Sequence, residues 1–158
     1  PVRWHAIGHV QTNKVRMLAP VVSLVHSLDS LKLAQELDRR AEAAGRKIPA
    51  LIQVNVAGEE TKFGVNEAGL FELAPQVAQL RHLQLVGLMT IPPFAEDGEA
   101  NRRHFARLRE LAEELIGQGL PPECMSELSM GMTSDFEVAV EEGATLVRVG
   151  TAIFGPRK

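Results

Sequence analysis

The sequence predicts a parallel α/β fold, and three observations predict it. Apolar segments of strand length alternate with amphipathic helical segments along the 158 residues. The strand segments are apolar at nearly every position, as in sheets that helices cover. The last two strand segments each run into a turn of glycine, serine and threonine, which is where a (β/α)8 barrel holds phosphate. An open Rossmann sheet would need a glycine-rich fingerprint after its first strand, and residues 7–13 (IGHVQTN) are not one.

The first third of the chain predicts two strands and two helices. The strands cover residues 4–8 and 21–26, and a short helix over residues 12–18 lies between them. Pro20 ends the first helix because proline cannot continue a helix. Ser27 or Asp29 caps the second helix, which runs to about residue 44. Its apolar residues recur at helical spacing and predict one face packed on the sheet: Leu31, Ala34, Leu37 and Ala41.

The middle of the chain predicts a strand, a helix and a further strand. The strands cover residues 50–56 and 83–91, and Pro92 and Pro93 end the second one. Asn66 caps the helix between them, because an asparagine side chain can accept from the first turn. The apolar face of this helix consists of Leu70, Leu73, Val77 and Leu80.

The last third repeats the pattern. A helix over residues 99–116 carries its apolar face at Phe105, Leu108, Leu111, Ala112 and Leu115. Residues 124–129 and 146–149 are the fifth and sixth strands. Between them, Ser134 and Glu137 have the spacing of a capping box and open a helix over residues 136–142.

About six βα units are two fewer than a (β/α)8 barrel needs. We therefore expect residues 1–158 to form a single, incomplete barrel domain, with roughly 60 or more residues of the barrel lying before Pro1. A sheet that lacks two units has exposed edges, so we expect self-association of this chain alone and a monomer at full length.

Composition excludes several functional classes. The formal net charge is −3, and the arginines of residues 102–109 lie among glutamates, so we expect no nucleic-acid partner. Cys124 is the single cysteine, which excludes an internal disulfide. No apolar run reaches membrane-spanning length and no leader is present, so we expect no membrane partner and a cytoplasmic location. His5 and His9 have no partner at metal-ligand spacing, so we expect no metal site.

Two turns near the end of the sequence carry the main functional signal. Residues 127–133 (ELSMGMT) and 145–155 (TLVRVGTAIFG) join strands to small residues, whose backbone N–H groups a phosphate can reach. Arg148 lies in the apolar stretch before the second turn and needs a polar partner or a wet cavity. Two alternatives stay open: Gly131 and Gly150 serve only the turns, or Arg148 pairs with a buried carboxylate.

Five segments, in this order and spacing, carry a family resemblance: WHAIGHVQTNK, HSLDS, IQVNVAGEETKFGV, GLMTIPP and LSMGMTSDFEVAVEEGATLVRVGTAIFG. The sequence resembles the pyridoxal-phosphate homeostasis protein family, relatives of the barrel domain of alanine racemase. Ala6 departs from the larger apolar residue usual in that family. The resemblance implies a barrel of the alanine-racemase N-terminal type. In the family, a lysine on the first barrel strand holds the cofactor as a Schiff base, and that lysine is not present in this sequence.

The resemblance also implies a site for pyridoxal 5′-phosphate. The implied residues are Ser129, Gly131, Gly150 and Thr151 for the phosphate, Met130 beside the turn, Arg148 for the pyridine nitrogen, and Asn55 and Lys62 at the mouth. The helix after Ser134 would add its positive end to the phosphate site. A guanidinium cannot readily accept the proton of a protonated pyridine nitrogen. It therefore keeps the ring neutral and weak as an electron sink.

The implied function is the binding and transfer of pyridoxal 5′-phosphate in intracellular homeostasis, without turnover. The implied recipients are apo enzymes that use this cofactor. One alternative is a racemase or decarboxylase of amino acids on the same barrel. Against it, the sequence has no tyrosine to act as a second base, and only residues 156–158 follow the last turn, where those relatives carry a β-rich domain. Another alternative is a cofactor-free barrel that binds a phosphosugar.

Overall fold

A parallel sheet of five strands forms the centre of the computed structural model, which describes residues 2–60 and 62–156. The strands are β1 (Trp4–Ala6), β2 (Val22–Leu28), β3 (Ile48–Gln53), β4 (Leu83–Met89) and β5 (Glu127–Ser129). They lie in the order β1-β2-β3-β4-β5, and every neighbouring pair is parallel. Each connection therefore advances by one strand in the same direction, which is the topology of a barrel wall.

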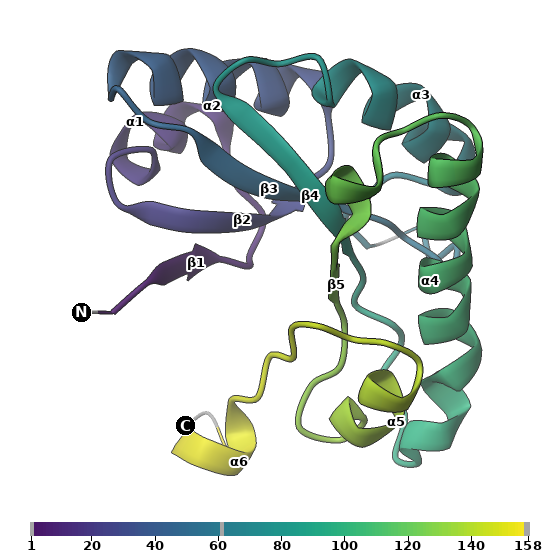
Figure 1. The fold of residues 1–158 in the computed structure, drawn as a ribbon. Coiled ribbons are helices and arrows are strands. Elements are labelled where there is room, and N and C mark those ends of the chain that lie inside the picture. The colour runs from purple at the N-terminus through teal and green to yellow at the C-terminus, as the bar shows by residue number, and fades with distance from the viewer. Residues whose placement is uncertain (1, 61, 157–158) are drawn as a thin grey trace.

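Helices cover one face of this sheet. The α-helices are α1 (Val15–Leu18), α2 (Leu31–Ala43), α3 (Glu67–Val77), α4 (Arg102–Gly117), α5 (Phe136–Glu141) and α6 (Thr151–Phe154). The 3-10 helices are η1 (Thr12–Lys14), η2 (Gly98–Asn101) and η3 (Pro122–Met125). Figure 1 shows α2, α3 and α4 wrapped around the outside of the curled sheet, as right-handed crossovers in one direction require.

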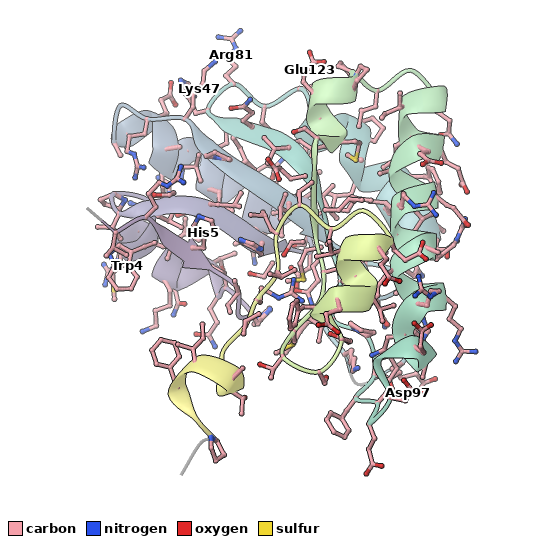
Figure 2. All side chains as sticks on the ribbon, turned by 60° about the horizontal axis from the view of Figure 1, so that its bottom comes forward. Trp4, His5, Lys47, Arg81, Asp97 and Glu123 are labelled. Atoms are coloured by element: carbon pink, nitrogen blue, oxygen red, sulfur yellow. The ribbon has the colours of Figure 1, made fainter. Side chains whose placement is uncertain are left out.

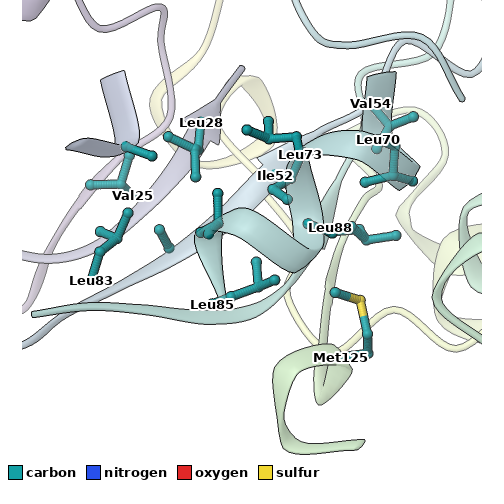
Figure 3. Packing of buried hydrophobic residues seen from close by; sticks show 14 of the residues in the cluster. Val25, Leu28, Ile52, Val54, Leu70, Leu73, Leu83, Leu85, Leu88 and Met125 are labelled. Atoms are coloured by element: carbon teal, nitrogen blue, oxygen red, sulfur yellow. The ribbon is translucent and has the colours of Figure 1, made fainter. Parts of the chain in front are cut away.

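The two faces of the sheet are packed differently, because successive strand residues point to opposite faces. Val25, Ile52 and Leu88 face the helices and belong to the large core cluster, part of which is shown in Figure 3. Their chain neighbours on the inner face form a separate, small cluster of Leu24, Leu51 and Met89. The inner face therefore has little apolar packing of its own, with only the partly buried Val86 and Leu146 packed against this small cluster among the described residues.

Different loops lie at the two ends of the sheet. Lys47, Arg81 and Glu123 come just before β3, β4 and β5, and Figure 2 shows them at one end of the molecule. Asp97, in the loop after β4, lies at the opposite end in the same view. Barrel sites are built at the carboxyl ends of strands, so the loops near Asp97 are the place to look for a site. Among the described residues, no helix combines the length and the hydropathy needed to cross a membrane.

The sequence predicted the order of the elements, and the sixth strand is the main error. Over residues 146–149, Leu146 makes only an isolated parallel bridge with Ser129. The N–H of Arg148 donates to the carbonyl of Gly131 at 2.9 Å, which is in the turn after β5. The chain thus leaves the ladder after one bridge. β5 is also shorter than predicted, because residues 122–125 form η3.

The helix caps were predicted in part. Asn66 caps α3 as predicted and accepts from the N–H of Gly69 at 2.8 Å. The cap of α2 is Ser30, and the prediction of Ser27 or Asp29 is wrong. The Ser27 hydroxyl instead donates to the carbonyl of Gly8 at 2.6 Å. Ser27 therefore ties the carboxyl end of β2 to the loop after β1.

Candidate functional site

Arg148 lies on the inner face and is held by neutral acceptors. One guanidinium nitrogen donates to the Ser129 hydroxyl at 2.6 Å and another to the Thr90 carbonyl at 2.8 Å. Burial lowers the pKa of Arg148 to about 10, and the charge of Asp135 opposes this shift, so Arg148 remains charged at neutral pH. Within residues 2–60 and 62–156, no carboxylate forms an ion pair with Arg148, so the predicted alternative of a buried ion pair is not what the structure shows.

A chain of polar side chains continues from Arg148 across the inner face. The fully buried Ser129 hydroxyl lies 2.8 Å from Nδ1 of His26, and Nε2 of His26 lies 3.0 Å from Nδ1 of His5. His26 is only 2% exposed. Burial, followed by the charges of His5 and Arg148, lowers the pKa of His26 to about 4, so this imidazole is neutral at pH 7. The Ser129 hydroxyl is therefore bonded on both sides and is not a free nucleophile.

The start of α5 is already occupied by a carboxylate. Asp135 is the N-cap residue, so the predicted capping box of Ser134 is wrong. One oxygen of Asp135 accepts from the N–H of Met132 at 2.7 Å and the other from Nδ2 of Asn101 at 2.8 Å. Asp135 thus places a negative charge at the start of α5, although its side chain makes no hydrogen bond to the first turn of that helix. This leaves the turn before α6 as the better place for an anion.

The two glycine turns meet at the start of α6. The N–H of Ala152 donates to the Thr133 hydroxyl at 3.4 Å, which joins the turn after β5 to the turn after Arg148. Among the described residues, the N–H groups of Gly150 and Thr151 have no protein acceptor. Backbone N–H groups left open in a turn can bind an anion.

The two glycines of these turns have different reasons to be glycine. Gly131 has φ +92°, and an added Cβ would lie 2.6 Å from Cβ of Ala139, so the fold itself requires glycine there. At Gly150, φ is −121°, and an added Cβ would meet nothing within 4 Å. The space beside Gly150 is therefore open, as a site for a close-fitting anion needs.

Asn55 and Lys62 form a second group in the loop after β3. Nδ2 of Asn55 donates to the Glu59 carbonyl at 2.7 Å, and Nζ of Lys62 forms an ion pair with Oε2 of Glu59 at 2.6 Å without hydrogen-bond geometry. Burial, and then the charges of Arg103 and Lys62, lower the pKa of His104 in α4. The Lys62 amine is therefore close to Glu59 and to the start of α4.

The Met130 side chain is fully buried in the large core cluster on the helix side. Its backbone N–H donates to the Leu146 carbonyl at 3.1 Å, so only its backbone belongs to the turn. His26, Thr90 and Thr133 also belong to this site and were not predicted from the sequence. For His26 the signal was present, because a histidine inside the apolar strand Val22–Leu28 raises the same question as Arg148. Thr90 contributes a backbone carbonyl, for which no sequence signal exists.

The site combines backbone N–H groups that have no protein acceptor among the described residues, a charged Arg148 and a neutral His26. In the part of the chain that the structure describes, no three His, Cys, Asp or Glu side chains gather as metal ligands would. The arrangement thus places open backbone N–H groups and a buried cation on the same segment, which are groups that an anion can contact.

Comparison with known proteins identifies the family. A family model described as "Alanine racemase, N-terminal domain" matches residues 2–158. The "Pyridoxal phosphate homeostasis protein" of Aquifex aeolicus is 50% identical over 157 residues, which cover 99% of this chain and 68% of that protein. The protein of the same name from Escherichia coli is 40% identical over 156 residues, which cover 99% and 65%. The chain thus spans about two thirds of the length of these curated relatives.

Solved structures give the same result. PipY of Synechococcus elongatus, solved with PLP bound, has a TM-score of 0.88 and 40% identity, and the match covers 98% of this chain and 71% of PipY. Alanine racemase of Clostridium difficile has a TM-score of 0.80 at 14% identity, over 99% of this chain and 40% of that one, which shows a shared fold alone. The five-stranded sheet is thus part of a barrel of the alanine-racemase type. The chain belongs to the alanine racemase N-terminal domain family and, within it, to the pyridoxal phosphate homeostasis proteins.

Proposed function

We propose that this protein binds pyridoxal 5′-phosphate and serves in its homeostasis by holding the cofactor and passing it on, without turnover of its own. The observation that carries the proposal is the junction of the two turns, at Thr133 and Ala152, on the same segment as the charged Arg148. Relatives with this name, and PipY with PLP bound, support the choice of ligand. The cofactor supplies the reactive aldehyde, and the chain supplies the groups that hold its other end.

The phosphate fits the turns. We assign it to the N–H groups of Gly150 and Thr151, with the Gly131 turn shaping the opposite side. Glycine at position 150 allows the anion to approach the backbone, since no protein atom needs that space. Ser129 contributes by binding Arg148, because its hydroxyl already lies 2.6 Å from the guanidinium.

We assign the cofactor ring to the space beside Arg148. Its guanidinium has donors beyond the two that reach Ser129 and Thr90, and a pyridine nitrogen is an acceptor. A ring nitrogen that accepts from a guanidinium stays unprotonated, which makes the ring a weak electron sink. This environment favours a carrier over a racemase or a decarboxylase.

Asn55 and Lys62 are proposed to line the mouth of the site, with Lys62 released from Glu59 when it contacts the ligand. Recipients of the cofactor are proposed to be apo enzymes that use it, in the cytoplasm, where a lone Cys124 stays reduced. We further propose that the full-length protein is a monomer and that this chain alone self-associates. The exposed Val2, Trp4 and Ile7 beside the edge strand β1 support self-association.

Titration of the protein with pyridoxal 5′-phosphate, followed by the visible absorbance of the cofactor, tests the proposal. Saturable binding is expected, and Gly150→Val should weaken it at least about tenfold, because a branched side chain fills the anion's space. Gly117→Val is the matched control, since Gly117 in α4 also has open space around its Cβ and lies outside both turns. Equal affinity in all three proteins would refute the assignment of the phosphate. Turnover of alanine would instead favour a racemase. Binding of phosphosugars but not of the cofactor would favour a cofactor-free barrel that binds a phosphosugar.

A further inference from the structure

A chain of hydrogen bonds joins strands that are not neighbours in the sheet. His26 is on β2 and Ser129 is on β5, and β3 and β4 lie between these two strands. In a flat sheet, strands three places apart are separated by about 14 Å. The side chains nevertheless lie 2.8 Å apart, because the sheet curls and both point to its inner face. The contact therefore spans the concave face directly.

Counting protons along this chain gives it a direction. Arg148 can only donate, so the Ser129 hydroxyl accepts from it. The Ser129 proton then needs an acceptor, and among the described residues Nδ1 of His26 is the one within reach. His26 must therefore carry its own proton on Nε2, which faces Nδ1 of His5. His5 is exposed, so its remaining nitrogen can exchange protons with water.

We infer that His26 is a positioning residue for Arg148, acting through Ser129 in a directed chain Arg148 → Ser129 → His26 → His5. These hydrogen bonds hold the Arg148 guanidinium toward the space beside the second turn, where we assign the ring nitrogen of the cofactor. That consequence rests on the proposed function, whereas the direction of the chain does not. Figure 2 shows the last member, His5, which lies on β1.

A neutral histidine suits this role. The groups that face His26 are His5, Ser129 and the charged Arg148, and a second cation among them would be unfavourable. Protonation at Nδ1 would also turn the acceptor of the Ser129 proton into a donor. Burial keeps this imidazole uncharged, which preserves both the direction of the chain and the position of Arg148.

Nitrogen-15 NMR of the ligand-free protein tests the direction of the chain. We expect His26 as the tautomer with hydrogen on Nε2, and slowly rotating Arg148 guanidinium N–H groups with their own signals. In His26→Leu the Arg148 signals should broaden or vanish, whereas His26→Asn should restore them because its amide oxygen can accept from Ser129. His26 found with hydrogen on Nδ1, or Arg148 signals unchanged in His26→Leu, would overturn the inference.

Binding measurements test the consequence for the ligand. His26→Leu should weaken pyridoxal 5′-phosphate about tenfold and leave inorganic phosphate within about twofold, because only the ring meets Arg148. His26→Asn should recover most of the loss. His82→Asn is the control, since His82 lies just before β4 at the other end of the sheet. Equal loss of both ligands would show a merely structural role and contradict the inference. If wild type binds neither ligand, the proposed function fails, and the NMR result still decides the direction of the chain.

Discussion

Arginines on the two faces of this molecule have opposite environments. On the outer face, Arg107 of α4 pairs with Glu67, Glu110 and Glu114, and these carboxylates raise its pKa. On the inner face, burial lowers the pKa of Arg148, whose partners are a hydroxyl and a carbonyl. A carboxylate neutralises a guanidinium, whereas a neutral acceptor leaves its charge available. The outer arginines therefore serve the protein surface, and the inner one is available to an anionic ligand.

Gly131 lies in the turn after β5 at the inner site, and its replacement should cost more stability than a change at either set of arginines. Gly131→Ala places a Cβ 2.6 Å from that of Ala139 in a backbone with φ +92°. We expect a loss of about 3 kcal/mol in the free energy of unfolding, measured by urea denaturation. Gly150→Ala is the comparison and should unfold like wild type. If Gly131→Ala were equally stable, the view that the fold itself requires this glycine would be wrong.

Removing the inner charge should change binding far more than removing an outer one. Arg148→Gln should weaken pyridoxal 5′-phosphate by about 30-fold or more, because a charge-assisted contact in a partly buried site is lost. Arg107→Gln should leave the affinity unchanged. Calorimetric titration of both variants measures this difference, and similar losses would show that the two faces do not differ in function.

Acid should destabilise the inner face first. The pKa of His26 is lowered to about 4 from 6.5, so the unfolded state binds more protons than the folded state between these values. Stability should therefore fall as the pH drops from 6.5 to 4, by roughly 1 kcal/mol per pH unit from this group. His26→Asn should remove that part of the slope in pH-dependent urea denaturation. On the outer face, arginines lower the pKa of Glu36 and Glu67, whose contributions disappear only below pH 4.5.

Outer ion pairs should contribute least. Arg107→Gln is expected to cost about 0.5 kcal/mol at low salt and less at high salt, because exposed pairs are screened by water and ions. Thermal denaturation at two salt concentrations measures the effect. A loss as large as that of Gly131→Ala would mean that the arginine–glutamate pairs of α4 hold the barrel wall together.

Local pattern predicted most of the fold. The spacing of Leu31, Leu37 and Ala41 predicted α2, because a helix packed on a sheet must place apolar residues on one face. Asn66 predicted the start of α3, because capping involves only neighbouring residues. The sixth strand failed for the opposite reason. Its residues have strand character, but a strand also needs a partner along its length, and Leu146 has one bridge.

Sequence patterns predict the order of the first five strands and their helices, the two small-residue turns and a charged Arg148 in an apolar segment. Which acceptors bind that guanidinium depends on the tertiary structure. The curl of the sheet brings His26 from β2 to Ser129 on β5, more than a hundred residues later. Periodicity reports on which face a residue occupies within its own element. It carries no information on how strongly the sheet curves, and curvature sets which inner side chains meet.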